Sequence, residues 1–281
     1  MTLEPRQPVG LIAGAGRLPF LVAAGMRQAN RLVVMVALDG HASRRLVGLA
    51  DVLVWGGLTR PGLWLRTFAK YDVHEAVMIG GVRKRAMYSP LTLLWHLPDW
   101  RAIRMWYFRL RKDRRDNAVL LAMAEELRKK DIELISSVKY CTEHLAGEGL
   151  MTPTPLPDNL EGDVEFGWRI ARASADLDIG QSIAVKERDI IAVEAVEGTD
   201  AMIRRAGRLC RSGGWTMVKV ARPKQDMRFD VPTIGPGTLR HLKDARCACL
   251  VVEAGKTLIV DKPATLALAE QLKIAVVGKK A

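Results

Sequence analysis

Acidic, basic and amide side chains are concentrated between Asp176 and Gly235, at the ends of short apolar segments. At such ends, side chains from separate segments can converge on one ligand. The polar residues of this block are Asp178, Gln181, Glu194, Glu197, Thr199, Asp200, Lys219, Gln225, Asp226, Arg228 and Asp230. Phosphoryl chemistry commonly uses carboxylates that hold a divalent metal ion and basic side chains that bind phosphate oxygens. The block therefore predicts a site for a phosphate-containing substrate.

These residues also have purely structural interpretations. Thr199 and Asp200 precede a helical stretch, where they fit a helix N-cap and an acid of the first turn. Asp230 precedes Val231-Pro232 and fits a turn. Glu194 and Glu197 fit the solvent side of a strand. The residues alone leave both interpretations open.

A glycine cluster, Gly14-Ala15-Gly16, follows the first apolar segment and precedes a helical stretch. This arrangement can present backbone N–H groups and the positive end of a helix to a phosphate or nucleotide. Pro19 stands where a dinucleotide motif has its third glycine, whereas Asp39 ends the second apolar segment as a ribose ligand would. The two signals conflict, and a tight strand-to-helix turn explains the glycines equally well.

Apolar segments and amphipathic helical stretches alternate through the N-terminal half. Strands are expected at VGLIAG, RLVVMVAL, DVLVWGG, HEAVMIGG and IELISS, and helices at 18–28, 61–71 and 116–130. Uninterrupted apolar strands separated by helices are typical of a parallel sheet covered on both faces. We expect a Rossmann-like α/β domain over residues 1–140.

The alternation of apolar and amphipathic segments ends at LMTPTPLPDNLEGD, whose prolines and acids suit neither helix nor strand. We therefore expect a linker over 141–157. Beyond it, helices are expected at 163–175, 200–207 and 238–245, with a hairpin in QSIAVKERDIIAVEAV, a strand in WTMVKVA and a second hairpin in CACLVVEAGKTLIVD. A last helix and strand complete a mixed α/β domain over 158–281.

Composition sets broad limits on the class of protein. The chain has 281 residues, is 49% hydrophobic and carries a net charge of +12. No apolar run approaches the roughly 20 residues that span a bilayer, and no signal segment is recognisable, so we expect a cytosolic protein. Four cysteines without C-x-x-C spacing favour structural thiols over zinc ligands or disulfides.

The positive charge is concentrated in residues 83–115, which hold ten basic residues against two acids. Within it, LTLLWHLPDWRAIRMWYFRLRKDRR interleaves aromatic and basic side chains. Such a segment suits the headgroup level of an anionic membrane. It also suits nucleic acid, or a packed helix with a solvated basic face.

Four sequence motifs carry a resemblance to a known family. They are LIAGAGRLP near the N-terminus, DIGQ, EGTDAMIRR and K-x-x-[KR]-P-x-Q-[DE]-x-R-x-D-[LV]-P-T-I-G. With them the chain resembles the UDP-2,3-diacylglucosamine pyrophosphatases of the LpxI type, from residue 9 to 278 and most densely over 177–237. The resemblance implies a hydrolase of lipid A synthesis that releases UMP and 2,3-diacylglucosamine 1-phosphate (lipid X). It implies water attack on the α-phosphorus, assisted by Mg²⁺ or Mn²⁺.

The resemblance also implies roles for individual residues. Asp230 is expected to be catalytic, assisted by Asp200 or Glu197, with Asp230 and Asp200 as metal ligands. Lys219 and Arg228 are expected to bind phosphate oxygens. The full set of expected substrate-binding residues is Gly14, Ala15, Gly16, Leu18, Pro19, Gly80, Gln181, Thr199, Lys219, Gln225, Arg228 and Thr233. The family commonly has Asn where this chain has Gly81, so no side-chain contact is carried over there.

A lipid-linked UDP-sugar substrate favours the membrane interpretation of residues 91–115. We therefore expect a cytoplasmic protein, peripherally bound to the inner membrane, with no nucleic-acid partner and with homodimerisation implied by the family. One alternative is an NAD-dependent oxidoreductase, which the missing third glycine and the lack of a Tyr-x-x-x-Lys pair disfavour. Another is a non-catalytic RNA-binding protein that uses residues 83–115.

Overall fold

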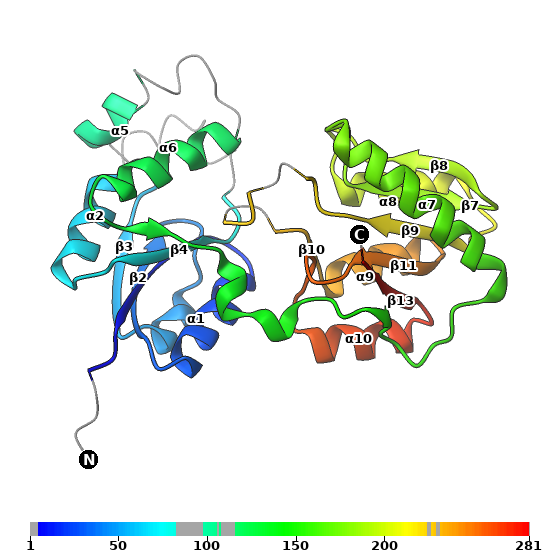
Figure 1. The fold of residues 1–281 in the computed structure, drawn as a ribbon, viewed down its shortest axis with the longest axis horizontal. Coiled ribbons are helices and arrows are strands. Elements are labelled where there is room, and N and C mark those ends of the chain that lie inside the picture. The colour runs from blue at the N-terminus through cyan, green and yellow to red at the C-terminus, as the bar shows by residue number, and fades with distance from the viewer. Residues whose placement is uncertain are drawn as a thin grey trace. The chain divides into compact units, whose positions relative to one another are not determined.

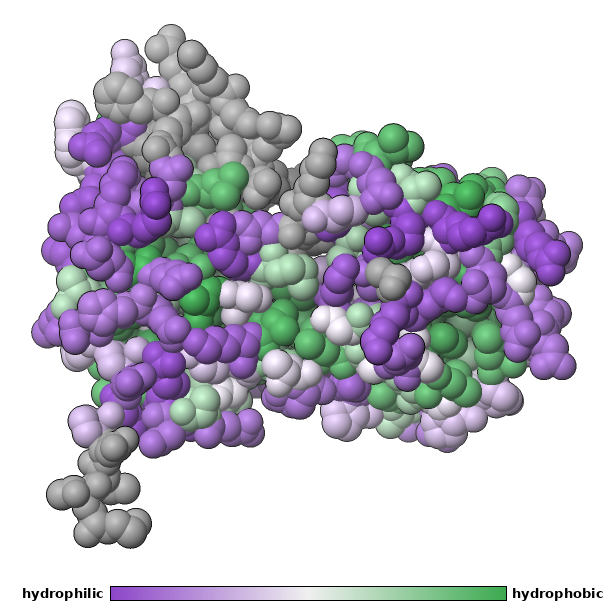
Figure 2. Space-filling model, in the orientation of Figure 1, coloured by the Kyte–Doolittle hydropathy of each residue, from purple (hydrophilic) through white to green (hydrophobic). Residues whose placement is uncertain are grey.

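The computed structural model of the chain describes residues 5–82, 98–105, 107, 116–223, 226–228 and 231–280. The chain divides into two compact units (Figure 1). The first unit comprises Met1–Cys141 with Met227–Phe229, and the second comprises Thr142–Asp226 with Asp230–Ala281. Each unit has its own buried core, and the face shown in Figure 2 is predominantly hydrophilic.

The first unit is built on a five-stranded parallel sheet of order β3-β2-β1-β4-β5. Its strands are β1 (Pro8–Ala13), β2 (Leu32–Leu38), β3 (Val52–Gly56), β4 (Glu75–Ile79) and β5 (Glu133–Leu134). β1 and β2 are buried along almost their whole length, as a sheet covered on both faces requires. The predicted parallel α/β architecture is confirmed.

Helices lie on both faces of this sheet (Figure 1). They are α1 (Leu18–Gln28), α2 (Pro61–Lys70), α5 (Trp100–Met105) and α6 (Asp116–Arg128), with short 3-10 helices η1 (Arg44–Leu49) and η3 (Ser137–Tyr140). One core joins α2 and α6 to the sheet through Trp64, Phe68 and Leu127. On α1, Gly25 lies so close to the Tyr140 carbonyl that a Cβ would collide with it. Only glycine therefore allows this contact between α1 and η3.

The second unit has a six-stranded mixed sheet of order β6-β13-β11-β9-β7-β8. Its strands are β6 (Gly149–Leu150), β7 (Ser182–Lys186), β8 (Asp189–Val193), β9 (Trp215–Lys219), β11 (Cys247–Glu253) and β13 (Ala275–Lys279). β9, β11 and β13 are parallel, whereas β6, β7 and β8 run antiparallel to their neighbours. A separate parallel pair joins β10 (Thr233–Ile234) to β12 (Leu258–Ile259). The predicted mixed α/β character is confirmed.

Helices also cover both faces of the mixed sheet. α7 (Asp158–Asp176) packs on one face, where Gly167 admits the side chains of Val185 and Val218. α8 (Thr199–Leu209), α9 (Pro236–Asp244) and α10 (Lys262–Gln271) share the core of the other face. This second layer matters for function because α8 and α9 both begin beside the pocket described below.

Residues 141–157, expected as a linker, belong to the second unit except for Cys141. They contain the 3-10 helix η4 (Thr142–His144) and the edge strand β6, which pairs with β13. Thr152 Oγ1 accepts a hydrogen bond from Val276 N at 3.0 Å. The proline-rich stretch thus follows the edge of the sheet, where residues without a free N–H are tolerated.

Of the two predicted hairpins, one is confirmed and one is wrong. β7 and β8 pair antiparallel, and Glu187 and Arg188 form their turn with positive φ angles of 53° and 60°. β11 and β12 do not pair with each other, since β11 lies between β9 and β13 and β12 pairs with β10. Both edges of the buried apolar strand β11 are occupied by parallel partners, which leaves no edge for a hairpin.

Candidate functional site

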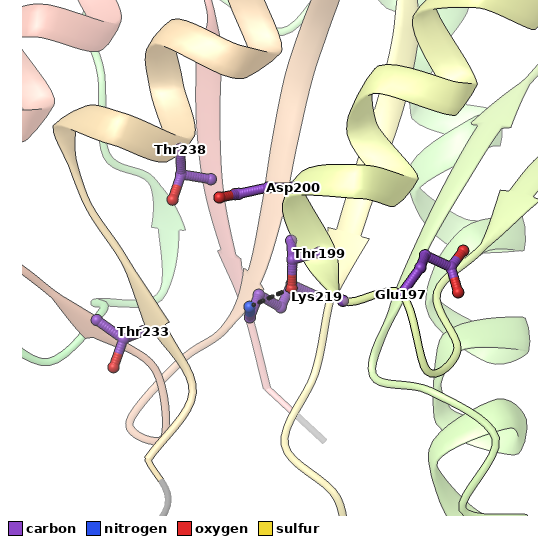
Figure 3. A pocket seen from close by; sticks show the side chains of 7 residues that line it. Glu197, Thr199, Asp200, Lys219, Thr233 and Thr238 are labelled. Atoms are coloured by element: carbon purple, nitrogen blue, oxygen red, sulfur yellow. Dashed lines mark hydrogen bonds between the residues drawn. The ribbon is translucent and has the colours of Figure 1, made fainter. Parts of the chain in front are cut away.

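A polar pocket of about 340 Å³ lies in the second unit (Figure 3). Its lining residues come from the turn before α8, the start of α8, the end of β9, the strand β10 and the start of α9. They are Glu197, Gly198, Thr199, Asp200, Lys219, Thr233 and Thr238. Five of them, all but Gly198 and Thr238, were expected from the sequence as site residues.

The start of α8 supplies backbone donors to the pocket. Gly198, with a φ of 80°, is the N-cap residue of the helix and has no side chain with which to cap it. The first N–H groups of a helix have no intrahelical acceptor, and the helix dipole places positive charge there. Thr199 is therefore the first residue of the helix and not its N-cap, which corrects the structural alternative considered from the sequence.

Lys219 is the last residue of β9 and is almost fully buried. Its Nζ donates to Thr199 Oγ1 at 3.1 Å, and Thr199 Oγ1 donates to Glu194 Oε1 at 2.9 Å. The dashed line in Figure 3 marks the contact between Lys219 and Thr199. The pocket thus has a lysine held in one place, which suits a phosphate oxygen as ligand.

Asp200 brings a carboxylate to the same pocket. It lies in the first turn of α8, and its Oδ1 is 3.2 Å from Nδ1 of His241 on α9. Figure 3 shows the Asp200 side chain directed toward Thr238. More than half of the Asp200 side chain is exposed, so the carboxylate is accessible to a ligand.

The Glu197 carboxylate has a different position. It accepts hydrogen bonds from Arg205 Nη2 at 2.5 Å and from Ala195 N at 3.1 Å. The hydrogen bond from Arg205 is the main reason why the pKa of Glu197 is lowered. In Figure 3 the carboxylate points away from Asp200, although other parts of the residue line the pocket. A catalytic role for Glu197 stays a prediction.

The remaining residues of the acid block are distributed as follows. Thr233 Oγ1 donates to Val231 O at 2.8 Å at the pocket wall. Gln181 lies beside the end of β9, because Val220 N donates to Gln181 O at 2.9 Å. Asp178 pairs with Arg222 at 3.2 Å.

Three further expected residues cannot be assigned to this pocket. Arg228 belongs to the first unit. Gln225 and Asp230 lie outside the described residues. The expected roles of all three stay predictions.

The sequence did not single out Thr238 of the pocket, nor the burial of the neighbouring Glu194. Thr238 is in the first turn of α9, and the Pro236-Gly237 pair before it is a recognisable signal for a helix start. Glu194 was counted in the polar block, with the solvent side of a strand as its structural alternative, whereas it is buried directly after β8. The sequence does not show whether a carboxylate at the end of an apolar strand is buried, because that depends on which helix covers the strand.

The glycine cluster of the first unit forms an interlocked pair of turns. Ala15 N donates to Gly81 O at 2.8 Å, and Gly81 N donates to Ala15 O at 2.9 Å. A Cβ on Gly14 would lie 2.8 Å from the carbonyl carbon of Gly80, whose own φ is 105°. These contacts explain Gly14 and Gly80 by close backbone approach. Gly16 has a φ of 102° and open space around it, next to the start of α1.

The other expected residues at this turn belong to the start of α1. Leu18 is its first residue and Pro19 is buried in its first turn. Proline suits this position because the N–H it lacks would have no intrahelical acceptor. Nucleotide binding at the turn stays a prediction for Gly14, Ala15, Gly16, Leu18, Pro19 and Gly80.

A second cavity, of about 510 Å³, lies in the first unit beside the N-terminal ends of β1 and β4. Its charged side chains are paired: Glu75 accepts from Lys139 at 2.8 Å and from Arg31 at 3.0 Å. Arg31 also donates to Tyr140 Oη at 3.0 Å. Arg31 and Lys139 are thus both paired with Glu75, which favours a structural role for these charges over binding of an anionic ligand.

The pocket has oxygen donors that suit the expected divalent cation. No three His, Cys, Asp or Glu residues in the described part of the chain are grouped as a metal site. Asp200 and the hydroxyls of Thr199, Thr233 and Thr238 are hard oxygen donors, as Mg²⁺ prefers. Mg²⁺ commonly uses one or two protein carboxylates together with substrate phosphates and water. The described donors fit that pattern, with Asp200 as the carboxylate.

The fold and the pocket define a two-unit α/β protein with a polar site at a helix start in its second unit. Family models for the LpxI N-terminal domain and the LpxI C-terminal domain match residues 8–144 and 147–277. The UDP-2,3-diacylglucosamine pyrophosphatase LpxI of Caulobacter vibrioides is 32% identical over 282 residues, which cover 96% of each chain. The chain belongs to the LpxI family, as its motifs predicted.

Two solved structures show only a distant likeness. WbmG of Bordetella bronchiseptica, in complex with NAD and UDP, is 14% identical with a TM-score of 0.30, over 46% of this chain and 36% of that one. UDP-glucose-4-epimerase of Stenotrophomonas maltophila, with NAD and formylated UDP-arabinopyranose, is 13% identical with a TM-score of 0.30, over 45% and 35%. Likeness of this extent carries no argument about ligand or activity.

Proposed function

We propose that this protein hydrolyses the diphosphate of UDP-2,3-diacylglucosamine to UMP and 2,3-diacylglucosamine 1-phosphate, in lipid A synthesis. The observation that carries the proposal is the pocket at the start of α8, where Lys219, Thr199 and Asp200 meet in a chain of the LpxI family. The curated relative from Caulobacter vibrioides carries this activity in its name. Family membership also favours this function over the oxidoreductase and RNA-binding alternatives.

The pocket has the donors that a diphosphate needs. Helix N-termini bind phosphate through free N–H groups and the helix dipole. Lys219 adds a positive charge, and the hydroxyls of Thr199, Thr233 and Thr238 add further donors. The Asp200 carboxylate in the same pocket repels an anion unless a cation lies between them. That combination favours a metal-bridged diphosphate over a free one.

Asp200 and Asp230 would hold the metal, Mg²⁺ or Mn²⁺. When bound, such an ion neutralises phosphate charge and lowers the pKa of a bound water. His241 Nδ1 on α9 lies 3.2 Å from Asp200 Oδ1, beside the carboxylate that would bind the metal. In our proposal Asp230 directs the attacking water toward the α-phosphorus, and Lys219 and Arg228 bind the nonbridging oxygens on which negative charge develops.

We further propose that the first unit binds the uridine at the Gly14–Gly16 turn. Gly16 leaves open space beside the start of α1. The N–H groups of that helix start can bind the phosphate next to the ribose. Leu18, Pro19 and Gly80 belong to the same turn region and would shape the site around the nucleotide.

We also propose a cytoplasmic protein that binds the inner membrane peripherally and forms a homodimer. No helix in the described part of the chain has the length and apolar character to cross a membrane. Most of the segment 91–115 lies outside the described residues, but its described part includes α5, where Trp100 is 75% exposed and lies beside Arg101. Exposed tryptophan beside arginine suits a lipid headgroup layer. Flotation with anionic vesicles tests this point, since unbound protein would contradict it.

Incubation of the protein with UDP-2,3-diacylglucosamine and Mg²⁺ in ¹⁸O water tests the reaction. The expected products are UMP carrying the label and unlabelled sugar phosphate, because water bonds to the α-phosphorus. Label in the sugar phosphate would redirect the attack to the β-phosphorus. Intact substrate would overturn the proposed function. The variant Lys219→Met, which keeps a similar side-chain length without charge, is expected to raise the KM, whereas Lys186→Met on the same sheet is the matched control.

A further inference from the structure

Three polar side chains lie in one row across the sheet of the second unit. Lys219 on β9 is directly opposite Ser182 on β7. Glu194 N donates to Ser182 O at 2.8 Å, so Glu194 adjoins Ser182 on its other side. Side chains two residues apart on a strand share a face, and Ala184 and Met217 belong to the core beneath α8 and α9. The row therefore faces these two helices.

The Thr199 hydroxyl connects the two charged ends of the row. It donates to Glu194 Oε1 at 2.9 Å and accepts from Lys219 Nζ at 3.1 Å. A carboxylate only accepts hydrogen bonds and an ammonium only donates them. The hydroxyl proton must therefore point to Glu194, and a hydroxyl lone pair must face Lys219. The two ends fix the direction of the chain.

These residues are buried to an extent that is unusual for charged side chains. Glu194 and Lys219 are each 6% exposed, and Ser182 is 0% exposed. Glu194 Oε2 and Ser182 Oγ have no hydrogen-bond partner among the residues that the structure describes. An apolar pair of similar volume would pack here without the cost of desolvating two charges. Stability of the fold therefore gives no reason for a carboxylate at position 194.

We propose that Glu194 is a positioning residue for the diphosphate of the substrate. Through Thr199 it fixes where the Lys219 ammonium stands and which way the Thr199 hydroxyl points. Groups held before the substrate arrives need not be ordered during binding, and this preorganisation strengthens the interaction. The inference rests on the proposed function because it assumes a diphosphate at Lys219.

A double-mutant cycle on the full chain tests the inference. The variants are Glu194→Ala, Lys219→Met and the two combined, with KM and kcat measured on UDP-2,3-diacylglucosamine. Loss of one hydrogen bond to a charged group is expected to raise the KM of Glu194→Ala about tenfold, with a smaller change in kcat. Because Glu194 acts through Lys219, the double variant is expected to match Lys219→Met alone. An additive loss in the double variant would overturn the inference.

Two further variants separate positioning from folding. Glu194→Gln keeps an oxygen acceptor for Thr199, and its KM is expected to lie close to the wild-type value. Glu165→Gln removes the charge of an exposed glutamate on α7 that pairs with Lys279, and is expected to leave the KM unchanged. If Glu194→Ala lowers the melting temperature without raising the KM in the folded protein, Glu194 is only structural and the inference fails.

Inorganic pyrophosphate binding, measured by calorimetry on the same variants, separates this inference from the proposed function. If the wild-type protein binds pyrophosphate but does not hydrolyse the UDP-sugar, the proposed function fails, and the same cycle is run on the dissociation constant. A Glu194→Ala dissociation constant equal to that of the wild-type protein would overturn the inference on its own.

Discussion

The Glu197 carboxylate lies 2.5 Å from Nη2 of Arg205 and accepts a second hydrogen bond from Ala195 N. Arg205 also donates to Val193 O at 2.7 Å, so the same arginine ties the end of β8 to the turn. The turn closes with Gly198 N donating to Ala195 O. These contacts place the start of α8, and with it Thr199 and Asp200, at the pocket.

This relationship leads to a prediction for Glu197. Replacement by Gln keeps an acceptor for Ala195 and Arg205, so kcat/KM is expected to stay within about threefold of the wild-type value. A general acid or base would lose roughly a hundredfold or more on the same change. Steady-state kinetics decide between the two roles. A hundredfold loss in kcat with an unchanged KM would support a catalytic role for Glu197.

Asp200 gives a prediction about the metal. Asp200→Asn is expected to raise the Mg²⁺ concentration for half-maximal activity at least about tenfold, because it removes a charged oxygen ligand. Mn²⁺ binding followed by electron paramagnetic resonance measures the same loss without turnover. Asp178→Asn, at an exposed residue paired with Arg222, is the matched control. Equal Mg²⁺ dependence in Asp200→Asn and wild type would remove Asp200 from the metal site.

Asp230 is expected to be essential. Asp230→Asn is predicted to lower kcat by more than about a hundredfold, since the carboxylate either binds the metal or directs the water. Its circular dichroism spectrum and melting temperature are expected to match those of the wild-type protein. A fully active Asp230→Asn variant would refute the assignment that the family motif gives to this residue.

Sequence patterns predicted the fold well where the signal is local. Continuous apolar runs such as LVVMVAL become the buried strands of a parallel sheet, and the Glu187-Arg188 turn joins a hairpin. The second predicted hairpin is wrong. CACLVVE and LI are close in sequence, but each pairs with a strand from elsewhere in the chain. Long-range pairing depends on which edges are free, and a single sequence does not show that.

The site was predictable in composition but not in arrangement. Glu197, Thr199, Asp200, Lys219 and Thr233 line one pocket, as their positions at element ends suggested. The sequence did not indicate that the Glu197 carboxylate would be bound by Arg205, eight residues later on α8. It also gave no sign that Glu194 would be buried, because the row with Lys219 exists only after β7, β8 and β9 have paired.

Glu75 in the first unit predicts how stability depends on pH. Its hydrogen bond from Lys139 lowers its pKa, burial opposes this, and Arg31 adds to the lowering. A lowered folded-state pKa contributes stability above the unfolded-state pKa of about 4.3, and this contribution is lost as the pH falls through the folded-state value. Near neutral pH, Glu75→Gln is expected to cost about 1 kcal/mol and to lower the melting temperature by about 3 °C.

The difference between Glu75→Gln and wild type is expected to shrink as the pH falls through the lowered pKa of Glu75 in the folded state, because below it both side chains are neutral. Thermal melts across this pH range provide the measurement. Glu133→Gln, on an exposed residue of β5, serves as the control and is expected to show no such trend. A Glu75→Gln deficit that persists unchanged at low pH would mean that packing, and not charge, accounts for it.

Gly14 offers a test of the interlocked turns in the first unit. An alanine there places its Cβ 2.8 Å from the Gly80 carbonyl carbon, and because both partners are backbone, no side chain can turn aside. Gly14→Ala is therefore expected to lower the melting temperature by about 5 °C. Gly48→Ala has nothing within 4 Å of the new Cβ and should be tolerated.

If the turn also binds the uridine, Gly14→Ala raises the dissociation constant for UMP at temperatures where the protein is folded. An unchanged UMP affinity in a destabilised variant would assign Gly14 to the fold alone, and the nucleotide would have to bind elsewhere.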